Sequence, residues 1–258
     1  MTALITGASS GIGAEYARQL AARGRDLVLV ARRGDRLRSL ADELQAAHGV
    51  AVGTLPADLE DDAGVAAVAE RIVGGPLISM LVNNAGYAVR GGVATLDPAA
   101  LARMLRLNVA ALAALSHAAM ARMTAAGEGA IINIASGTAF MQIPGNAGYG
   151  ASKAFVVAFT RHMQAEAAGT GVAVQLLVPG IVATDFHAVA GNDLARIPAE
   201  RVMTAPDLVT ASLVALDRGE PVCMPSVPDP TLWDGYVAAE RAIAATVSRD
   251  TVAERYRA

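Results

Sequence analysis

Short runs of apolar, largely β-branched residues recur along this chain, and longer stretches rich in alanine and leucine separate them. The runs are almost wholly apolar, which is typical of strands that are covered on both faces. Because the intervening stretches have helical spacing, the alternation predicts an α/β fold: a doubly wound parallel sheet of about seven strands with helices on both faces. The expected strands are residues 3–6, 27–31, 51–55, 78–82, 130–134, 172–178 and 222–224, and the expected helices are 13–23, 36–48, 60–73, 99–126, 149–168 and 207–218.

Residues that favour helix ends support these boundaries. Asp97 followed by Pro98 predicts an N-cap with proline in the first helical turn. Glycine ends helices because it adopts the left-handed conformation easily, and the glycines that stand at expected helix ends are Gly24, Gly49, Gly127 and Gly169.

The chain shows no linker, repeat or low-complexity segment, so residues 1–258 are expected to form a single domain. Residues 185–204 follow a strand end, where open α/β sheets bind their ligands, and are a candidate lid over the substrate. Residues 225–258 begin as a proline-punctuated loop and then predict one amphipathic helix from about residue 234.

Charge and cysteine content exclude several classes of protein. A formal net charge of −3 over 258 residues, with no basic block, argues against nucleic acid or anionic membrane as the main partner. Cys223 is the only cysteine, so no intrachain disulfide can form. No uncharged apolar run reaches the ~20 residues that cross a bilayer, and the beginning of the chain lacks the pattern of a secretory signal. We therefore expect a cytoplasmic protein.

Residues 6–13, Thr-Gly-Ala-Ser-Ser-Gly-Ile-Gly, connect the first expected strand to the first expected helix. Gly7 permits a tight turn, Gly11 lets the backbone approach a pyrophosphate, and Gly13 lets the helix lie close to the strand. The exposed N–H groups and the helix dipole would hold the anion. In this setting the loop predicts dinucleotide binding, with contacts from Gly7, Ser9, Ser10, Gly11, Ile12 and Gly13.

Further motifs follow in a fixed order: Asp58, Asn83-Asn84-Ala85-Gly86, Asn108, Ser136, Tyr149-x-x-x-Lys153 and Pro179-Gly180. With the T-G-x-x-x-G-x-G loop, they make the chain resemble the short-chain dehydrogenase/reductase (SDR) family, in its short, non-extended branch, from the first strand to about Thr184. The resemblance implies a Rossmann-like fold and an enzyme that exchanges hydride between a nicotinamide cofactor and a carbonyl or alcohol substrate.

Tyr149 and Lys153 are four residues apart at the start of an expected helix, so both side chains project from one face. An ammonium group close to a phenol should stabilise the phenolate and lower its pKa from about 10. The resemblance implies that Tyr149 is the general acid/base and that Lys153 tunes it while binding the nicotinamide ribose. It further implies that Ser136 orients the substrate oxygen and that Asn108 holds a water in a proton relay to Lys153.

The end of the second expected strand bears on the choice between NAD and NADP. A dinucleotide fold that binds NAD usually carries an acidic residue there, whereas this chain has Arg32 and Arg33. A guanidinium can pair with the 2′-phosphate of NADP, so NADP(H) is favoured and NAD(H) remains possible. Many NADP-dependent members of the family also carry a basic residue in the glycine loop, and this chain has Ser10 at that position.

The remaining expected contacts come from the resemblance. Asp58 would bind the adenine amino group. Asn83, Ala85 and Gly86 would line the adenosine side, and Pro179, Gly180, Ile181 and Thr184 would contact the nicotinamide. Substrate contacts are expected from Ser136, Met141 and Phe186, within a wider set that includes Phe140, Gln142, Ile143 and Trp233. These mostly apolar residues indicate a small apolar or mixed carbonyl compound or alcohol. No arginine pair marks a carboxylate or phosphate substrate.

Alanine-rich faces on residues 99–126 and 149–168, together with the resemblance, predict a homodimer or homotetramer. The serines stand in no G-x-S-x-G motif, which argues against a serine hydrolase, and the four histidines show no metal-binding spacing. Two alternatives to an NADP(H)-dependent reductase stay open. One is an NAD-dependent alcohol dehydrogenase with the same catalytic residues, and the other is a non-catalytic sensor of the cofactor.

Overall fold

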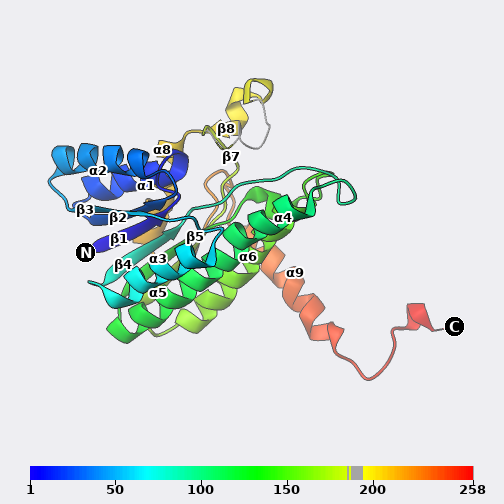
Figure 1. Ribbon diagram of the computed structural model, residues 1–258. Helices are drawn as coiled ribbons and strands as arrows, with labels where there is room; N and C mark the ends of the chain where they lie inside the picture. The colour runs from blue at the N-terminus through cyan, green and yellow to red at the C-terminus, as the bar shows by residue number, and fades with distance from the viewer. Residues whose placement is uncertain (185, 187–193, 258) are drawn as a thin grey trace. The chain divides into compact units, whose positions relative to one another are not determined.

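The computed structural model describes residues 1–184, 186 and 194–257 of the chain. A sheet of seven parallel strands, in the order β3-β2-β1-β4-β5-β6-β9, forms its centre (Figure 1). The strand order reverses between β1 and β4, which is where open sheets of this type bind ligands. The predicted doubly wound parallel sheet is confirmed. Its strands are β1 (Thr2–Thr6), β2 (Asp26–Ala31), β3 (Val52–Pro56), β4 (Ile78–Asn83), β5 (Gly129–Ile134), β6 (Val172–Leu177) and β9 (Val222–Cys223).

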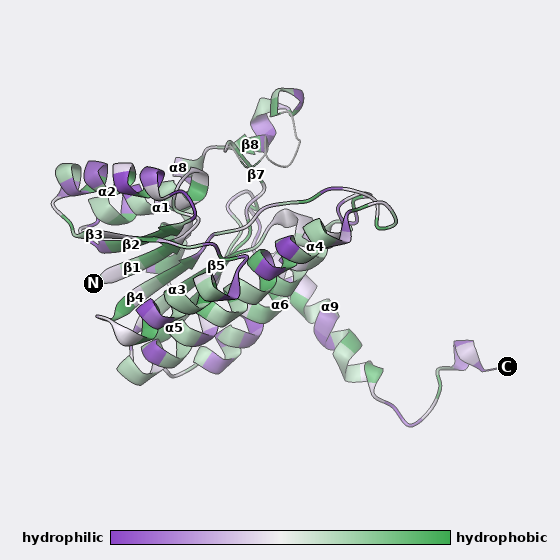
Figure 2. Ribbon diagram, in the orientation of Figure 1, coloured by the Kyte–Doolittle hydropathy of each residue, from purple (hydrophilic) through white to green (hydrophobic). Residues whose placement is uncertain are grey.

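Helices cover both faces of the sheet (Figure 1). On one face lie α1 (Gly11–Ala22), α2 (Gly34–His48) and α8 (Ala205–Asp217), and on the other lie α3 (Asp62–Gly74), α5 (Leu112–Ala126) and α6 (Ala147–Ala167). Alternate residues of one strand enter different cores: Ala3 and Ile5 face α1, whereas Leu4 packs in the cluster on the side of α3 and α5. This is the two-residue period of a strand that is buried on both sides, and the central strands are almost uniformly hydrophobic (Figure 2).

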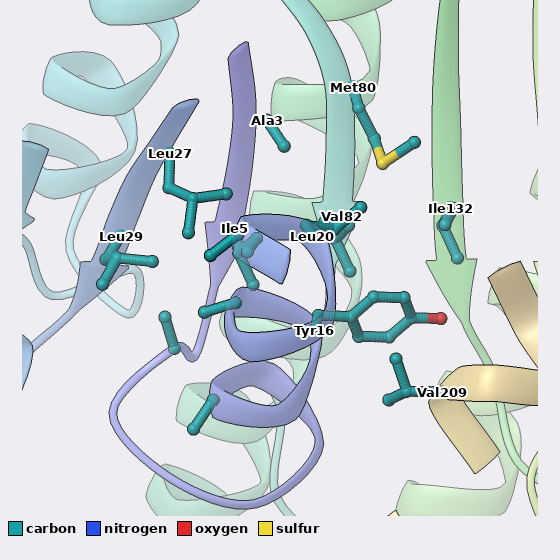
Figure 3. Close-up of a cluster of buried hydrophobic side chains, with 14 of the residues drawn as sticks. Ala3, Ile5, Tyr16, Leu20, Leu27, Leu29, Met80, Val82, Ile132 and Val209 are labelled. Atoms are coloured by element: carbon teal, nitrogen blue, oxygen red, sulfur yellow. The ribbon is translucent and has the colours of Figure 1, made fainter. Parts of the chain in front are cut away.

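A buried polar contact fixes α1 against α8. The Tyr16 ring packs among the apolar side chains of β1, β4 and α8, with its hydroxyl directed toward α8 (Figure 3). That hydroxyl donates to Ser212 Oγ at 2.5 Å, and Ser212 Oγ in turn donates to Gln175 Oε1 at 2.6 Å. Because a buried hydroxyl without a partner is costly, these bonds specify one relative position of the two helices.

The helix ends follow the sequence signals. The Asp97 carboxylate accepts hydrogen bonds from the N–H groups of Ala99 and Ala100 at the start of α4 (Pro98–Leu105). Gly49 and Gly127 end α2 and α5 in the left-handed conformation, with φ values of 68° and 72°. These predicted caps are confirmed.

The single helix expected over residues 99–126 is wrong in detail. A π-helical segment, η1 (Arg106–Ala111), lies between α4 and α5. Residues 98–126 are the one stretch, among those described, that is long and apolar enough to cross a membrane by length and composition. Its α5 part packs on β4, β5 and α3, as a core helix does.

Two short segments follow β6. Strand β7 (Ile181–Val182) pairs in parallel with β8 (Val202–Met203), and two 3₁₀ turns, η3 (Leu194–Arg196) and η4 (Ala199–Arg201), precede β8. Of the expected lid, Asp185 and residues 187–193 lie outside the described residues. The function of residues 185–204 as a lid stays a prediction.

Residues 226–258 form a compact unit separate from residues 1–225. Its helix α9 (Thr231–Val247) begins three residues before the expected start, because Asp229 Oδ1 accepts from the Thr231 N–H and hydroxyl. The helix has no buried residue, and a short 3₁₀ turn, η5 (Glu254–Tyr256), follows it. That the two units act as a single domain stays a prediction.

Candidate active site

The expected site residues come from separate parts of the sequence and follow the carboxyl ends of successive strands. The glycine loop follows β1, Arg32 and Arg33 follow β2, Asp58 follows β3, and Ala85 and Gly86 follow β4. Ser136 follows β5, and Pro179 and Gly180 follow β6. Because all of these strands are parallel, their ends meet at one edge of the sheet.

The glycine loop has the geometry that its sequence predicts. Gly7 and Gly11 have positive φ values of 67° and 56°, which other residues adopt only with strain. A Cβ on Gly13 would lie 2.4 Å from the Gly7 carbonyl oxygen, so only glycine fits. Ser10 precedes α1 without a side-chain cap, which leaves the first helical N–H groups directed at the loop. This cradle fits the pyrophosphate of a dinucleotide.

Two residues that the sequence analysis did not assign hold this loop against β4. Asn84 Nδ2 donates to the Thr6 oxygen at 2.8 Å and to the Gly7 oxygen at 3.3 Å. Thr6 Oγ1 accepts from the N–H groups of Asn84 and Ala85, each at 3.0 Å. Asn84 stands inside the Asn83–Gly86 motif, so the motif was a usable signal. The contact itself depends on β1 and β4 being neighbours.

Arg33 crosses from the end of β2 to the glycine loop. Its Nη2 lies 2.8 Å from Ser9 Oγ and 2.8 Å from Ser10 Oγ, and its Nε lies 3.1 Å from Ser9 Oγ. A guanidinium and two hydroxyls therefore gather beside the anion-binding loop. Ser10 stands where many NADP-dependent relatives have a basic residue. In this chain Arg33 places a positive charge at that point of the loop.

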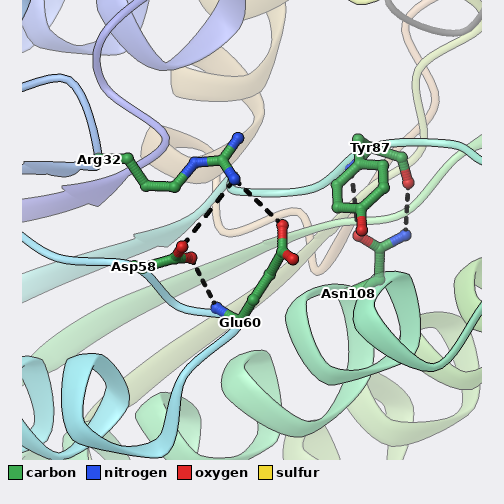
Figure 4. A network of polar contacts seen from close by, with 5 residues as sticks. All are labelled: Arg32, Asp58, Glu60, Tyr87 and Asn108. Carbon is green, nitrogen blue, oxygen red and sulfur yellow. Dashed lines mark hydrogen bonds and ion pairs between the residues drawn. The ribbon is translucent and has the colours of Figure 1, made fainter. Parts of the chain in front are cut away.

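Arg32 has different partners (Figure 4). Its Nη1 lies 3.2 Å from Glu60 Oε1 and 4.0 Å from Asp58 Oδ2, whereas Asp58 Oδ1 accepts from the Glu60 N–H at 3.0 Å. The Glu60 side chain is mostly buried at 15% exposure, and nothing in the sequence marked it. The sequence treats both arginines alike, but Arg32 pairs with carboxylates, whereas none of the described residues places a carboxylate within ion-pair distance of Arg33.

Asn108 lies in the π-helical segment and is 1% exposed. Its Oδ1 accepts from the Tyr87 N–H at 3.1 Å, and its Nδ2 donates to the Tyr87 oxygen at 2.9 Å (Figure 4) and to Ser152 Oγ at 3.2 Å. A Cβ on Gly86 would meet Asn108 Oδ1 at 2.9 Å and Lys153 Nζ at 3.6 Å. Asn108 and Lys153 therefore both lie against Gly86. The proton relay through Asn108 stays a prediction.

Tyr149, Lys153 and Ser136 come together at the start of α6. Lys153 Nζ lies 5.8 Å from the centre of the Tyr149 ring and donates to the oxygen of Ile134, two residues before Ser136, at 2.9 Å. Ser136 is the N-cap of a 3₁₀ turn, η2 (Gly137–Phe140), and its Oγ accepts from the Thr138 N–H at 3.2 Å. The Ser136 side chain is also close enough to the Tyr149 hydroxyl to lower the pKa of the phenol. All three side chains are more than nine-tenths buried.

The two titratable groups differ from the expected electrostatics. Burial raises the pKa of Tyr149 to about 12, against the opposing effects of the Ser136 hydrogen bond and the Arg90 charge. Burial lowers the pKa of Lys153 to about 8. The expected lowering of the phenol pKa is therefore wrong for the chain by itself, because desolvation outweighs the neighbouring charges. The phenol keeps its proton at neutral pH.

Asn83 lies in a buried polar network beneath this site. Its Nδ2 donates to Ser116 Oγ and to Asn133 Oδ1, each at 2.9 Å, and Asn133 Nδ2 donates to Thr160 Oγ1 at 3.1 Å. These residues, 0–4% exposed, join β4 and β5 to α5 and α6. Because the Asn83 side-chain amide is bonded within this network, only its backbone could make the predicted contact with the cofactor.

The residues expected to contact nicotinamide and substrate lie around the same edge. The Gly137 N–H donates to the Pro179 oxygen at 2.9 Å, and a Cβ on Gly11 would meet the Thr184 side chain at 3.3 Å. The Phe186 ring centre lies 5.8 Å from that of Tyr149. Met141 is 55% exposed beside η2. Gly180 and Ile181 lie between Pro179 and Thr184, and Ile12 packs beside the core under the loop.

A glycine loop at the strand ends, together with a buried tyrosine, lysine and serine along the same sheet edge, is the arrangement expected of a dinucleotide-dependent oxidoreductase. Comparison with known proteins agrees: a family model described as short chain dehydrogenase matches residues 1–195. The chain belongs to the short-chain dehydrogenase/reductase family. It is an NAD(P)-dependent enzyme that acts on alcohol or carbonyl groups.

Several relatives are similar over most of their length. Sulfoacetaldehyde reductase of Chromohalobacter salexigens is 39% identical over 79% of this chain and 83% of its own. A short-chain dehydrogenase from Sphingobium yanoikuyae, solved in complex with NADPH, is 40% identical with a TM-score of 0.94 over 99% of both chains. The bulky-bulky ketone specific alcohol dehydrogenase from Comamonas testosteroni is 34% identical with a TM-score of 0.91 over 100% of this chain and 98% of its own.

Proposed function

We propose that this enzyme is an NADP(H)-dependent reductase of small carbonyl compounds, with Tyr149 as the acid. The observation that carries the proposal is the buried Tyr149 phenol, which stands close to Ser136 and has the Lys153 amine 5.8 Å from its ring centre. A phenol with a pKa of about 12 holds its proton at neutral pH and can donate it to a developing alkoxide, which is the direction of reduction. Relatives named for sulfoacetaldehyde and for ketones support a carbonyl substrate.

In this mechanism Ser136 Oγ and the Tyr149 hydroxyl hydrogen-bond to the substrate carbonyl oxygen and polarise it. The nicotinamide supplies the hydride. Tyr149 gives its proton to the oxygen as negative charge develops there, and the Lys153 ammonium stabilises the phenolate that remains. With a pKa of about 8, Lys153 is mostly protonated at pH 7 and can carry out that role while holding the ribose. Asn108 holds the backbone of Tyr87 next to Gly86, close to Lys153. A proton that reaches Tyr149 again after the reaction would pass along this side of the site.

Tyr149→Phe tests this assignment. The variant keeps the ring that packs on Phe186 but has no proton to give, so we expect kcat to fall at least a thousandfold. Binding of NADPH, measured by fluorescence, should change less than threefold. Tyr256→Phe, which alters an exposed tyrosine, serves as the control and should retain full activity. Turnover by Tyr149→Phe close to the wild-type rate would contradict the role of the phenol. Tight NADPH binding by the wild type without turnover of any carbonyl compound would favour the sensor.

The preference for NADP(H) is proposed from Arg33. The Arg33 guanidinium donates hydrogen bonds to the Ser9 and Ser10 hydroxyls. If a 2′-phosphate took the place of these hydroxyls as the acceptor, Arg33 would form bidentate, charge-assisted hydrogen bonds to it. Arg33→Ala should raise the Kd for NADPH by about ten- to a hundredfold, since such bonds are worth about 1.5–3 kcal/mol. The Kd for NADH should change little. Equal affinity of the wild type for both cofactors would favour the NAD-dependent alternative.

We further propose that copies of the chain associate through α5 and α6. The faces of these helices away from the sheet carry exposed small residues, including Ala114 and Ala151, and the stacked, part-exposed rings of Phe155 and Phe159. Small residues let helices approach closely, and the aromatic pair supplies apolar area for an interface. Sedimentation equilibrium of the wild type and of Phe155→Glu tests this association.

A further inference from the structure

A loop that follows β4 covers the Tyr149 side of the site. Its residues Ala88 and Val89 pack in one apolar cluster with Met104 and Tyr149, and the Val89 N–H donates to Met104 Sδ at 3.3 Å. Phe186 packs against the same cluster. Apolar side chains therefore lie beside Tyr149, and Ala88 and Val89 lead directly to a charged residue.

That residue is Arg90. The Gly91 N–H donates to the Gly145 oxygen at 2.9 Å, four residues before Tyr149 in the chain. The backbone of Arg90 is thus fixed on one side by the Val89–Met104 contact and on the other by the Gly91–Gly145 bond. Both anchors belong to segments close to Tyr149, so the chain at Arg90 runs past the Tyr149 side of the site. At that position the positive charge of Arg90 acts to lower the pKa of Tyr149, although burial outweighs it.

The charge of Arg90 is uncompensated within the described part of the chain, where no carboxylate lies within ion-pair distance of it. Arg32, at the cofactor side, is by contrast held by Glu60 and Asp58. Arg90 is also exposed, so its guanidinium donors are hydrated and available. A guanidinium presents its N–H groups in a planar fork that matches a carboxylate or a sulfonate.

We propose that Arg90 binds an anionic group on the substrate, so that the preferred substrates are carbonyl compounds carrying a carboxylate or a sulfonate. This inference rests on the proposed carbonyl reductase activity. Ser136 and Tyr149 hold the carbonyl oxygen, Arg90 holds the anionic end, and the apolar cluster around Tyr149 lies beside the substrate. The expectation of an apolar or mixed carbonyl compound came from the apolar residues near the site, and the lack of an arginine pair gave no sign of an anionic substrate. One arginine with an available planar fork is sufficient to bind a single anionic group.

The test compares aldehyde acids of three to six carbons with their methyl esters, which keep the shape and remove the charge. Reduction is followed by loss of NADPH absorbance, and kcat/KM is measured for both members of each pair. We expect the wild type to prefer the acid at one chain length at least. Arg90→Gln should lower the ratio of acid to ester at least tenfold, while Arg90→Lys retains part of it. Arg122→Gln removes the same charge from an exposed position on α5 and should leave the ratio unchanged.

The dependence of KM on ionic strength is a second measurement, and it would not change if Arg90 only stabilised the fold. KM for the acid should rise with salt in the wild type and lose most of that dependence in Arg90→Gln. Preference for the ester at every chain length, or equal losses on acid and ester in Arg90→Gln, would overturn the inference and leave the proposed reductase standing. If no carbonyl compound, charged or neutral, is reduced with NADPH, the proposed function itself falls.

Discussion

Lys153 is chemically unique in this molecule, because it is the only lysine among the 21 lysine and arginine residues. An arginine at that position would stay charged at any ordinary pH, whereas a buried lysine can lose its proton. With the pKa of its amine lowered by burial to about 8, Lys153 can change charge near neutrality. The chain thus uses arginine where it needs fixed charge and its one lysine where the charge must respond to the site.

This buried amine makes the stability of the fold depend on pH in a predictable direction. Between pH 8 and the unperturbed value of 10.5, the unfolded chain holds the Lys153 proton and the folded chain does not, so stability rises with pH. Below pH 8 the destabilisation is complete. A shift of this size corresponds to about 3 kcal/mol.

Lys153→Met removes that pH dependence, because methionine has no proton to lose. We expect the free energy of unfolding of the wild type, relative to the variant, to increase by about 3 kcal/mol between pH 7 and pH 10.5. Urea unfolding of both proteins at several pH values measures it, and the shared contributions of tyrosines and Cys223 cancel in the difference. A difference independent of pH would contradict a lowered Lys153 pKa. Since the chain has one lysine, ¹⁵N-lysine labelling also gives a single Nζ signal to titrate.

For single residues, prediction from the sequence succeeded where a role depends on local spacing. Tyr149 and Lys153 are four apart on a helix, so their proximity could be predicted. It did not reach Glu60, because its pairing with Arg32 depends on β2 and β3 ending side by side. The pKa of Tyr149 was also out of reach, since it depends on how completely the folded chain excludes water from the phenol.

At the scale of elements, the close approach of α1 to β1 determines the shape of the cofactor loop. The two meet at Gly13, where a Cβ would overlap the Gly7 carbonyl and lie 2.5 Å from Asn84 Nδ2. Neither the carbonyl nor the Asn84 amide can move freely, because Asn84 also bonds to Thr6. The loop, the helix and β4 are therefore fixed as one assembly.

Gly13→Ala should force α1 away from the loop. We expect the free energy of unfolding to fall by roughly 2 kcal/mol, which is typical of overpacking, and NADPH binding to weaken at least tenfold. Gly74→Ala, at the end of α3, is the matched control, since its Cβ would meet nothing within 4 Å, and it should bind NADPH normally. Thermal unfolding and fluorescence titration measure both effects. Unchanged cofactor binding by Gly13→Ala would contradict this view of the loop.

The π-helical segment η1 shows where element prediction fails. Residues 98–126 are so uniformly apolar and rich in alanine that their periodicity does not distinguish an α-helix from one interrupted by wider turns. The interruption occurs around Asn108, whose amide pairs with both backbone groups of Tyr87. The wider turn at Asn108 is favourable because the backbone of Tyr87, which follows β4, lies where the Asn108 amide can bond to it.

At the scale of the whole molecule, the alternation of strands and helices was enough to predict the parallel sheet, because crossover connections leave few arrangements for such a chain. The order β3-β2-β1-β4-β5-β6-β9 then brings distant motifs to one edge. The sequence was less informative about residues 226–258, where the apolar residues of α9, including Leu232 and Ile243, are exposed and pattern alone does not say what they contact.

The polar network of Asn83, Asn133, Ser116 and Thr160 constrains how this fold can diverge. Each member supplies a donor or acceptor to another member, and all four side chains are buried. A single apolar replacement would leave a buried polar group without a hydrogen-bond partner, at a cost to folding stability of about 1–3 kcal/mol. Replacing the whole set with well-fitted hydrocarbon would avoid that penalty. Descendants of this chain should therefore keep the quartet intact or exchange its members in concert, and intermediates with one member missing should be rare.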